Sequence, residues 1–385
     1  MVSLSNDQML SGGAAAGQWK SLSGPQWIEK VKISASAIRS FRALPFAASR
    51  KLAPFSLRYS SQSLIHLETS IRSQSPVQME AKGSKQSAQQ RYAVITGANK
   101  GIGFETSKQL ASKGVMVVLT ARDEKRGLEA TSKLHDMGFP NVVFHQLDVL
   151  DPTSAKSLAL FLKEKFGRLD ILVNNAGASG VIVDEDGLRA MNIDPAEWLA
   201  GKVANLVQGV IKHTYQSAEL CLNTNYYGVK RVTEALLPLL QLSPSGARIV
   251  NVSSLRSELR RIPNEKTRKV LGDLDTLTEE KIDAILQKFL NDLETDALEE
   301  NGWSTMLPAY SISKATLNAY TRVLAKKYPS MCINCVHPGY VNTDINWHTG
   351  VMTLEEGASG PVMLALLPEG SPTGCYFDQT QLAEF

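Results

Sequence analysis

The sequence predicts an α/β fold in which helices cover both faces of a doubly wound parallel sheet. Short runs of apolar and β-branched residues recur along the chain and alternate with longer stretches of helical spacing. Several of these runs are continuously apolar, as expected for strands that are buried on both faces. With 385 residues, of which 43% are hydrophobic and 21% charged, the chain can bury one large α/β core.

The first unit of this pattern is the stretch RYAVITGANKGIGFETSKQLASKG. Its β-rich run, Tyr92–Thr96, is followed by Gly97, Gly101 and Gly103, and then by apolar residues at near-helical spacing. A second apolar run, 115–121, suits a buried parallel strand. Glycines at the first turn of such a βαβ unit let the backbone approach a pyrophosphate at the helix N-terminus. The unit therefore predicts dinucleotide binding.

The spacing of these glycines is informative. The pattern is Thr96-Gly97-x3-Gly101-x-Gly103, which differs from the GxGxxG of the commoner dehydrogenases. It resembles the TGxxxGxG motif of the short-chain dehydrogenase/reductase family. The resemblance implies a Rossmann-like domain, residues 86–385, that binds a nicotinamide cofactor. In the glycine turn it implies cofactor contacts from Thr96, Gly97, Asn99, Lys100, Gly101, Ile102 and Gly103.

The alternation of strands and helices continues to the C-terminus. Further strands are expected at 142–149, 168–177, 247–254, 331–344 and 374–378, joined by right-handed helical crossovers. The fourth of the strands counted from Tyr92 ends in the sequence NNAG, which resembles the family's signature behind the adenine ribose. Through these strand ends the resemblance implies more cofactor contacts, from Asp148, Val149, Asn174, Ala176, Gly177, Pro338, Gly339, Val341 and Thr343.

The charges after the second strand favour NADPH as the cofactor. NAD-preferring sites place an acid near the end of this strand, where it accepts from the ribose 2′-hydroxyl. This chain has Arg122 there and Lys100 in the glycine turn. Two cations suit a 2′-phosphate, because charge-assisted hydrogen bonds to phosphate are strong. Asp123 argues against this choice, unless its side chain points away from the cofactor.

The segment AYSISKAT places Tyr310 and Lys314 four residues apart, on one face of an expected helix. Taken alone, such a pair is usually an ordinary surface contact. In the family it is accompanied by a serine at the end of the fifth strand and by a helical asparagine. The resemblance matches these to Ser254 and Asn225, and it implies a catalytic tetrad of Asn225, Ser254, Tyr310 and Lys314.

The residue types of this tetrad suit carbonyl reduction. Hydride delivery to a carbonyl carbon needs an acid that protonates the developing alkoxide, but free tyrosine has a pKa of about 10. A neighbouring ammonium favours the phenolate, so Lys314 is predicted to lower the pKa of Tyr310 and to hold the nicotinamide ribose. Ser254 is predicted to hold the substrate oxygen. Asn225 is predicted to anchor a water that relays protons to Lys314.

We therefore expect an NADPH-dependent reductase of a small-molecule ketone or aldehyde, of the terpenoid or alkaloid kind. Alcohol oxidation with NADP⁺ at the same site is an open alternative, because the residues do not fix the direction of the equilibrium. A non-catalytic NADPH-binding regulatory module is disfavoured by the intact tetrad. A net charge of +3 does not indicate a nucleic-acid partner, and no apolar run is long enough to span a membrane.

Two insertions set this chain apart from the ordinary family pattern. Residues 255–309 separate Ser254 from Tyr310, and such a segment resembles that of the monomeric carbonyl reductases. Because it would cover the helices through which most family members dimerise, a monomer is expected. Residues 179–220 resemble a plant subgroup that contains salutaridine and menthone/neomenthol reductases. Both insertions are expected over the catalytic corner, as a lid lined by some of Trp198, Trp303, Met306 and Leu307, with His213 and His348 as solvated bystanders.

The N-terminal residues differ from the rest in composition. Residues 1–78 hold sixteen serines and nine basic against three acidic residues, a net +6 that leaves −3 for the remainder. An acid-poor, Ser- and Arg-rich start is typical of a chloroplast transit peptide, whereas Met79 offers a start suited to a cytoplasmic protein. Residues 1–85 are therefore expected to be a disordered extension, and both locations stay open.

The four cysteines do not form a disulfide framework in a chain of this length. Cys332 and Cys335 form a CxxC motif with His337 close behind. No second cluster supplies further ligands, so these residues are expected to be core thiols of a buried strand and no metal is expected.

Overall fold

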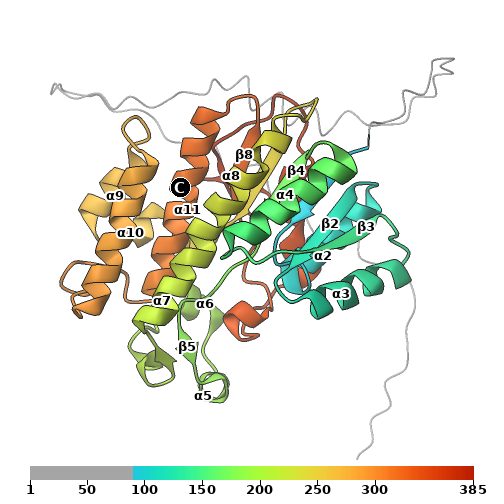
Figure 1. Ribbon diagram of the computed structural model, residues 1–385. Helices are drawn as coiled ribbons and strands as arrows, with labels where there is room; N and C mark the ends of the chain where they lie inside the picture. Colours follow the sequence, from blue (N-terminus) through green and yellow to red (C-terminus); the bar gives the residue numbers. More distant parts are fainter. Residues whose placement is uncertain (1–89) are drawn as a thin grey trace, which may run out of the picture. The chain divides into compact units, whose positions relative to one another are not determined.

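The computed structural model describes residues 90–385, so the predicted extension, 1–85, lies outside the described residues. An eight-stranded sheet forms the centre, in the order β10-β9-β8-β7-β4-β1-β2-β3 (Figure 1). All neighbouring strands pair parallel except β9 and β10. The strands are β1 Tyr92–Ile95, β2 Met116–Ala121, β3 Val142–Gln146, β4 Ile171–Asn174, β7 Arg248–Val252, β8 Cys332–His337, β9 Tyr376–Asp378 and β10 Gln381–Ala383.

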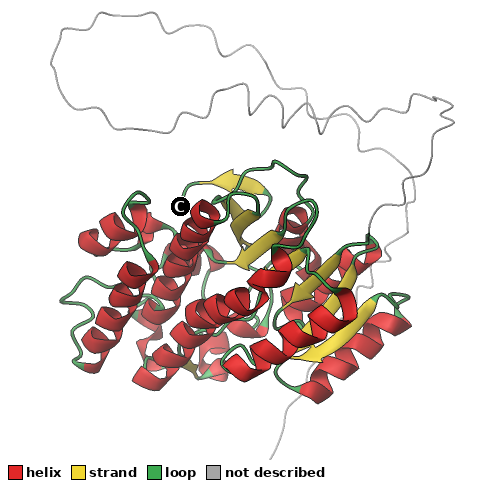
Figure 2. Cartoon of the chain, turned by 45° about the horizontal axis from the view of Figure 1, so that its top comes forward, coloured by secondary structure: helices red, strands yellow, loops and turns green. Residues whose placement is uncertain are grey.

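Helices cover the sheet on both faces, as predicted (Figure 2). Successive residues of β1 point to opposite sides: Ala93 and Ile95 belong to one buried cluster and Val94 to the other. Helices α2 (Gly101–Ser112), α3 (Glu124–Asp136) and α12 (Leu354–Ala365) bury their apolar faces in the first cluster. The second cluster lies under α4 (Pro152–Phe166), α7 (Tyr215–Leu222), α8 (Val229–Leu240) and α11 (Pro308–Lys327).

The first insertion forms a small lobe with its own core. It contains a two-stranded antiparallel sheet and short helices: β5 Ile182–Val183, α5 Glu185–Ala190, α6 Pro195–Ala200 and β6 Ile211–Lys212. Trp198 is buried in this core, where its ring meets that of Trp347 edge to face at 6.3 Å between centroids. Trp347 follows β8, so this contact holds the lobe against the main domain.

The helical part of the second insertion packs away from the cavity. Its helices, α9 (Glu265–Gly272) and α10 (Glu279–Glu294), lie against α11, and α10 also contacts α7 (Figure 1). Ile282, Leu286 and Phe289 of α10 are fully buried in the cluster shared with α11. The second insertion therefore extends the main core over the outer surface of α7 and α11.

Among residues 90–385 no helix combines the length and the apolar character that a membrane span requires.

Candidate active site

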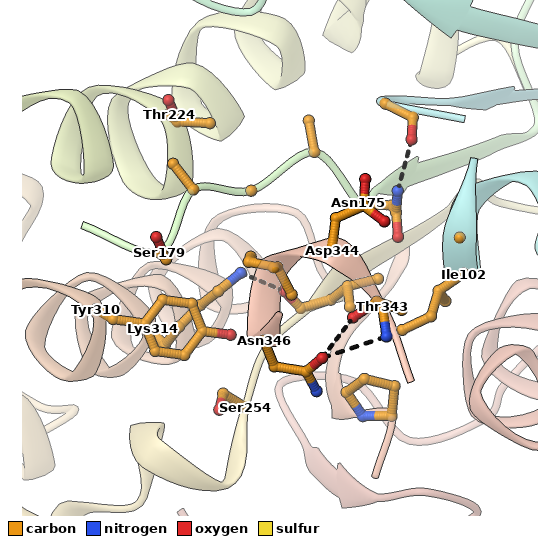
Figure 3. A pocket seen from close by; sticks show the side chains of 18 of the residues that line it. Ile102, Asn175, Ser179, Thr224, Ser254, Tyr310, Lys314, Thr343, Asp344 and Asn346 are labelled. Carbon is orange, nitrogen blue, oxygen red and sulfur yellow. Dashed lines mark hydrogen bonds between the residues drawn. The ribbon is translucent and has the colours of Figure 1, made fainter. Parts of the chain in front are cut away.

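A cavity of about 500 Å³ opens at the carboxyl ends of the parallel strands (Figure 3). This is where a doubly wound sheet binds its ligand, because the loops that follow the strands diverge there. The structure brings most of the predicted site residues to its wall. They are Gly97, Asn99, Lys100, Gly101, Ile102, Arg122, Asp148, Val149, Ala176, Gly177, Ser254, Tyr310, Lys314, Pro338, Gly339, Val341 and Thr343.

Three of the predicted cofactor residues lie behind the wall and support it. The Thr96 hydroxyl accepts hydrogen bonds from the backbone N–H groups of Asn175 and Ala176, both at 3.0 Å. Gly103 packs so closely on the glycine turn that a Cβ would lie 2.8 Å from the carbonyl oxygen of Gly97. The Asn174 amide donates to Asn251 in the neighbouring strand at 2.8 Å. It is Asn175, rather than Asn174, that lines the cavity.

Asn225 also lies behind the wall, fully buried in a π-helical turn, Asn223–Gly228. Its Oδ1 accepts from the backbone N–H of Ala178 at 2.8 Å, and its Nδ2 donates to the Ala178 carbonyl at 3.0 Å. The same amide nitrogen donates to Ser313 Oγ on α11 at 2.9 Å. The side chain thus ties the loop after β4 to the helix that carries Tyr310 and Lys314. The water-anchoring role stays a prediction.

The glycine turn provides a cradle that fits a pyrophosphate. Gly97 and Gly101 have φ angles of +62° and +59°, and a Cβ at Gly97 would lie 3.0 Å from Ala176 Cα. The N-terminus of α2 follows directly, and its N-cap residue, Lys100, makes no side-chain cap among the described residues. By contrast, α3 and α4 are capped by Asp123 and Asp151. Uncapped N–H groups facing a cavity suit an anionic phosphate.

Charged side chains lie at the second-strand end of the cavity, where the sequence predicted a 2′-phosphate contact. The Asp123 carboxylate accepts from the backbone N–H of Arg126 at 2.9 Å, which turns it toward α3 rather than the cavity. Arg122 is exposed, lines the cavity and has no side-chain partner among the described residues. Lys100 forms an ion pair with Asp344, which follows β8 and also lines the cavity. That carboxylate would compete with any anionic ligand for Lys100.

Tyr310, Lys314 and Ser254 converge at the other end (Figure 3). Tyr310 and Lys314 project from the first turns of α11, with the Lys314 Nζ 5.8 Å from the centroid of the Tyr310 ring. The ammonium donates to the carbonyl of Val252, the last residue of β7, at 2.8 Å. Ser254 lies two residues beyond that strand, and its hydroxyl accepts from the backbone N–H of Arg256 at 3.2 Å.

Burial has the largest effect on the pKa values of Tyr310 and Lys314. It raises the pKa of Tyr310 to about 12, while a hydrogen bond with Ser254 and the positive charge of Arg256 act to lower it. Burial also lowers the pKa of Lys314 to about 8. The cation that acts on the phenol here is Arg256, a residue outside the predicted tetrad. Lowering of the Tyr310 pKa by Lys314 stays a prediction for the complex with cofactor.

Several wall residues were not predicted from the sequence. Asn175 follows β4, Arg256 follows β7, and Tyr340 and Trp347 follow β8. The rule that ligands bind beyond the carboxyl ends of parallel strands would have found them, because each stands within a few residues of a strand or in the loop beyond it.

The predicted lid residues divide between wall and core. Trp198 and Leu307 line the cavity, whereas Trp303 and Met306 are buried away from it. His213 and His348 lie outside the wall. Within residues 90–385 no cluster of His, Cys, Asp or Glu has the arrangement of a metal site, and Cys332 and Cys335 lie in β8.

The fold and the site define a nicotinamide-dependent oxidoreductase of carbonyl and hydroxyl groups, and comparison with known proteins agrees. The model of the short chain dehydrogenase family matches residues 91–264, and the chain belongs to this family. The short-chain dehydrogenase/reductase 1 of Saponaria officinalis is 56% identical over 308 residues, which cover 79% of this chain and 99% of the relative.

Two further relatives have named activities. The (+)-neomenthol dehydrogenase of Arabidopsis thaliana is 51% identical over 299 residues, 77% of this chain and 98% of the relative. The solved structure of salutaridine reductase from Papaver somniferum superposes with a TM-score of 0.71 at 50% identity, covering 75% of this chain and 99% of that protein.

Proposed function

We propose that this protein is an NADPH-dependent reductase of ketones or aldehydes. The observation that carries the proposal is the convergence of Tyr310, Lys314 and Ser254 in one corner of the cavity. The loop that the family resemblance assigns to the nicotinamide, Pro338 to Thr343, lines the same cavity. A phenol, a cation and a hydroxyl at one point can together polarise a carbonyl and protonate its oxygen.

The choice of NADPH rests on the charges at the second-strand end. Arg122 supplies a guanidinium for a 2′-phosphate, and the acid beside it, Asp123, is turned away. A mouse relative that is named for this cofactor, carbonyl reductase [NADPH] 3, is 38% identical over 291 residues. When bound, NADPH supplies the hydride.

The chain's own residues would bind the substrate oxygen and move the proton. Ser254 donates its hydroxyl hydrogen to the carbonyl oxygen, since that hydroxyl already accepts from Arg256 N–H and so keeps its proton for the substrate. Tyr310 gives its phenolic proton to the same oxygen as the carbonyl carbon is reduced to the alcohol. Lys314 holds positive charge beside the phenol and lines the cavity, where it would bind the nicotinamide ribose as the family resemblance implies. Asn225 positions the Ala178 loop against α11.

The wall beyond Tyr310 favours a substrate with an apolar skeleton. Trp198, Leu307, Tyr340 and Trp347 line it, and they give the cavity a largely hydrocarbon surface at this end. Relatives named for a terpenoid alcohol and for an alkaloid, (+)-neomenthol dehydrogenase and salutaridine reductase, support this substrate type.

The test is the loss of reduced-nicotinamide absorbance when the purified protein is mixed with NADPH and a panel of menthone, simple aldehydes, quinones and alkaloid ketones. We expect reduction of at least one cyclic ketone. No turnover of any carbonyl compound would contradict the proposal. The same site can oxidise an alcohol with NADP⁺, and the ratio of the two rates at neutral pH establishes the favoured direction.

A further inference from the structure

Arg256 lines the cavity, and the reaction above gives its side chain no contact with the substrate. It lies in a short 3₁₀ turn, Leu255–Ser257, directly after Ser254. Its backbone N–H donates to the Ser254 hydroxyl, whereas its side chain lines the cavity. The guanidinium Nη2 donates to the carbonyl of Trp198 at 2.5 Å. Its Nε and Nη1 make no hydrogen bond within residues 90–385.

The charge of Arg256 lacks a counter-ion. Burial lowers the pKa of Arg256 to about 10, and the charge of Arg261 acts in the same direction. Only the hydroxyls of Tyr310 and Tyr340 oppose these effects, and no carboxylate within the described residues does. The nearest acid along the chain, Glu258, is engaged by Arg260 at 2.8 Å and by Arg261 at 2.9 Å.

A largely buried guanidinium with unused donors and no anion beside it is energetically costly unless a ligand pairs with it. The cavity around it offers aromatic surface from Trp198, Tyr340 and Trp347 and no carboxylate at this end. Lys314, the other cation near Tyr310, adds to the positive potential. An anionic oxygen would therefore be attracted here, and a planar carboxylate matches the donor geometry of arginine.

We propose that Arg256 binds a carboxylate of the substrate, so that the preferred substrates are oxo acids with an apolar skeleton. This deepens the proposed function and rests on it. Arg256 holds the acid group while Ser254 and Tyr310 engage the carbonyl. Because Arg256 and Ser254 are separated by one residue, the two groups of the substrate are held in a fixed relative position.

Arg261 provides a matched control for the side-chain role. Its Nη1 donates to the carbonyl of Leu199 at 2.9 Å, next to the Trp198 carbonyl that Arg256 binds. Both arginines therefore fasten the C-terminal end of α6 to the segment after β7. Arg261 is paired with Glu258 and does not line the cavity. If both arginines had a purely structural role, their substitution would have the same effect on substrate preference. If Arg256 binds a ligand, only its substitution would change that preference.

The experiment compares a cyclohexanone carboxylate with its methyl ester, measured as kcat/KM with NADPH. We expect the wild type to prefer the acid. Arg256→Gln should lower the acid-to-ester ratio by about tenfold to a hundredfold, the scale of a lost hydrogen bond to a charged group. Arg256→Lys should retain part of the preference, and Arg261→Gln should leave the ratio unchanged. Equal losses for acid and ester in Arg256→Gln, or the same loss of ratio in Arg261→Gln, would overturn the proposal.

A binding measurement separates this proposal from the reductase assignment. Trp198 and Trp347 line the cavity, so titration of the NADP⁺ complex with the carboxylate is followed by tryptophan fluorescence. Turnover of neutral ketones without preferential binding of the acid would reject the Arg256 role alone. If no carbonyl compound were reduced at all, the reductase assignment would fail, and the titration of wild type against Arg256→Gln would still decide whether the carboxylate binds.

Discussion

The two ends of the cavity are built in different ways. The cofactor end consists of short loops after β1, β2 and β4, where glycines and backbone N–H groups face the cavity. The substrate end combines Tyr310 and Ser254 with side chains from the first insertion and from the loop after β8. The first end is made of local sequence motifs, and the second depends on contacts between distant segments. We therefore expect substitutions at one end to change cofactor binding and substitutions at the other to change substrate choice.

Removal of the acid should have the largest effect. Tyr310→Phe is expected to lower kcat by about 10²–10⁴-fold or more, because the phenol is the proposed general acid, while the Kd for NADPH should change little. Stopped-flow turnover and fluorescence titration measure the two quantities. Tyr320→Phe is the matched control, since Tyr320 lies on the same helix with a buried hydroxyl that has no partner among the described residues. Normal turnover by Tyr310→Phe would remove the acid assignment.

The next prediction compares the loss of one tryptophan from each insertion. Trp303→Ala should cost about 3–5 kcal/mol of unfolding free energy, because a fully packed indole is lost. Trp303 donates to Asp292 at 2.7 Å and meets Phe289 edge to face. Trp198→Ala should instead raise the KM for the ketone more than the KM for NADPH, because Trp198 lines the cavity. Urea denaturation and steady-state kinetics measure both variants, and similar KM changes would undo the distinction between wall and core.

At the cofactor end, Arg122→Ala should lower the NADPH-to-NADH ratio of kcat/KM by about tenfold to a hundredfold, as expected for one charge-assisted contact. Arg126→Ala is the control, because that exposed arginine of α3 pairs with Asp123 away from the cavity. A ratio that stays constant in Arg122→Ala would argue against the 2′-phosphate assignment.

A smaller effect concerns stability and pH. The pKa of Lys314 falls from 10.5 to about 8 on folding, so between these values the unfolded chain binds a proton that the folded chain lacks. Stability contributed by this group therefore rises with pH through that window. Lys314→Met should gain the most stability at about pH 7, and the gain should disappear above about pH 10.5. Thermal unfolding across pH measures it, with the exposed Lys326→Met as control; a pH-independent difference would contradict the shift.

The last prediction concerns the oligomeric state, because dilution of the protein should not change its molar mass. Helix α10 buries its apolar face on α7 and α11, and by the family resemblance most members dimerise through helices that such a segment would cover. We therefore expect a monomer at all accessible concentrations, measured by light scattering. A stable dimer or tetramer would show that the second insertion leaves another association surface open.

The sequence predicted the sheet well and the short elements poorly. The expected strands at 92–96, 115–121, 142–149, 247–254 and 374–378 all correspond to strands of the structure, with boundaries that are shorter by a few residues. Strands β5 and β6 were missed because each has two residues, too few for any period to be detected. Strand β10 pairs antiparallel at the edge and owes its conformation to β9.

The sequence also predicted both insertions over the catalytic corner, and the structure separates them. The first insertion reaches the cavity through Trp198 and Leu199. The helices of the second, α9 and α10, contribute no residue to the wall. Their amphipathic pattern predicts that they are packed, but helix periodicity does not say against which partner.

The features that could be predicted from the sequence alone are those that depend on neighbours in the chain. Glycine spacing defines the cradle, four-residue spacing puts Tyr310 and Lys314 on one face, and strand order puts Ser254 at the end of β7. Only the tertiary structure shows which residues position Tyr310, Lys314 and Ser254, and which charged side chain lies near the phenol. Asn225 is held behind the wall by hydrogen bonds with Ala178 and Ser313. Arg256 is held beside the phenol by its hydrogen bond to Trp198. These partners lie far away in the chain. Such contacts form only after the core is packed, because burial and pairing of distant side chains depend on the whole fold and not on local periodicity.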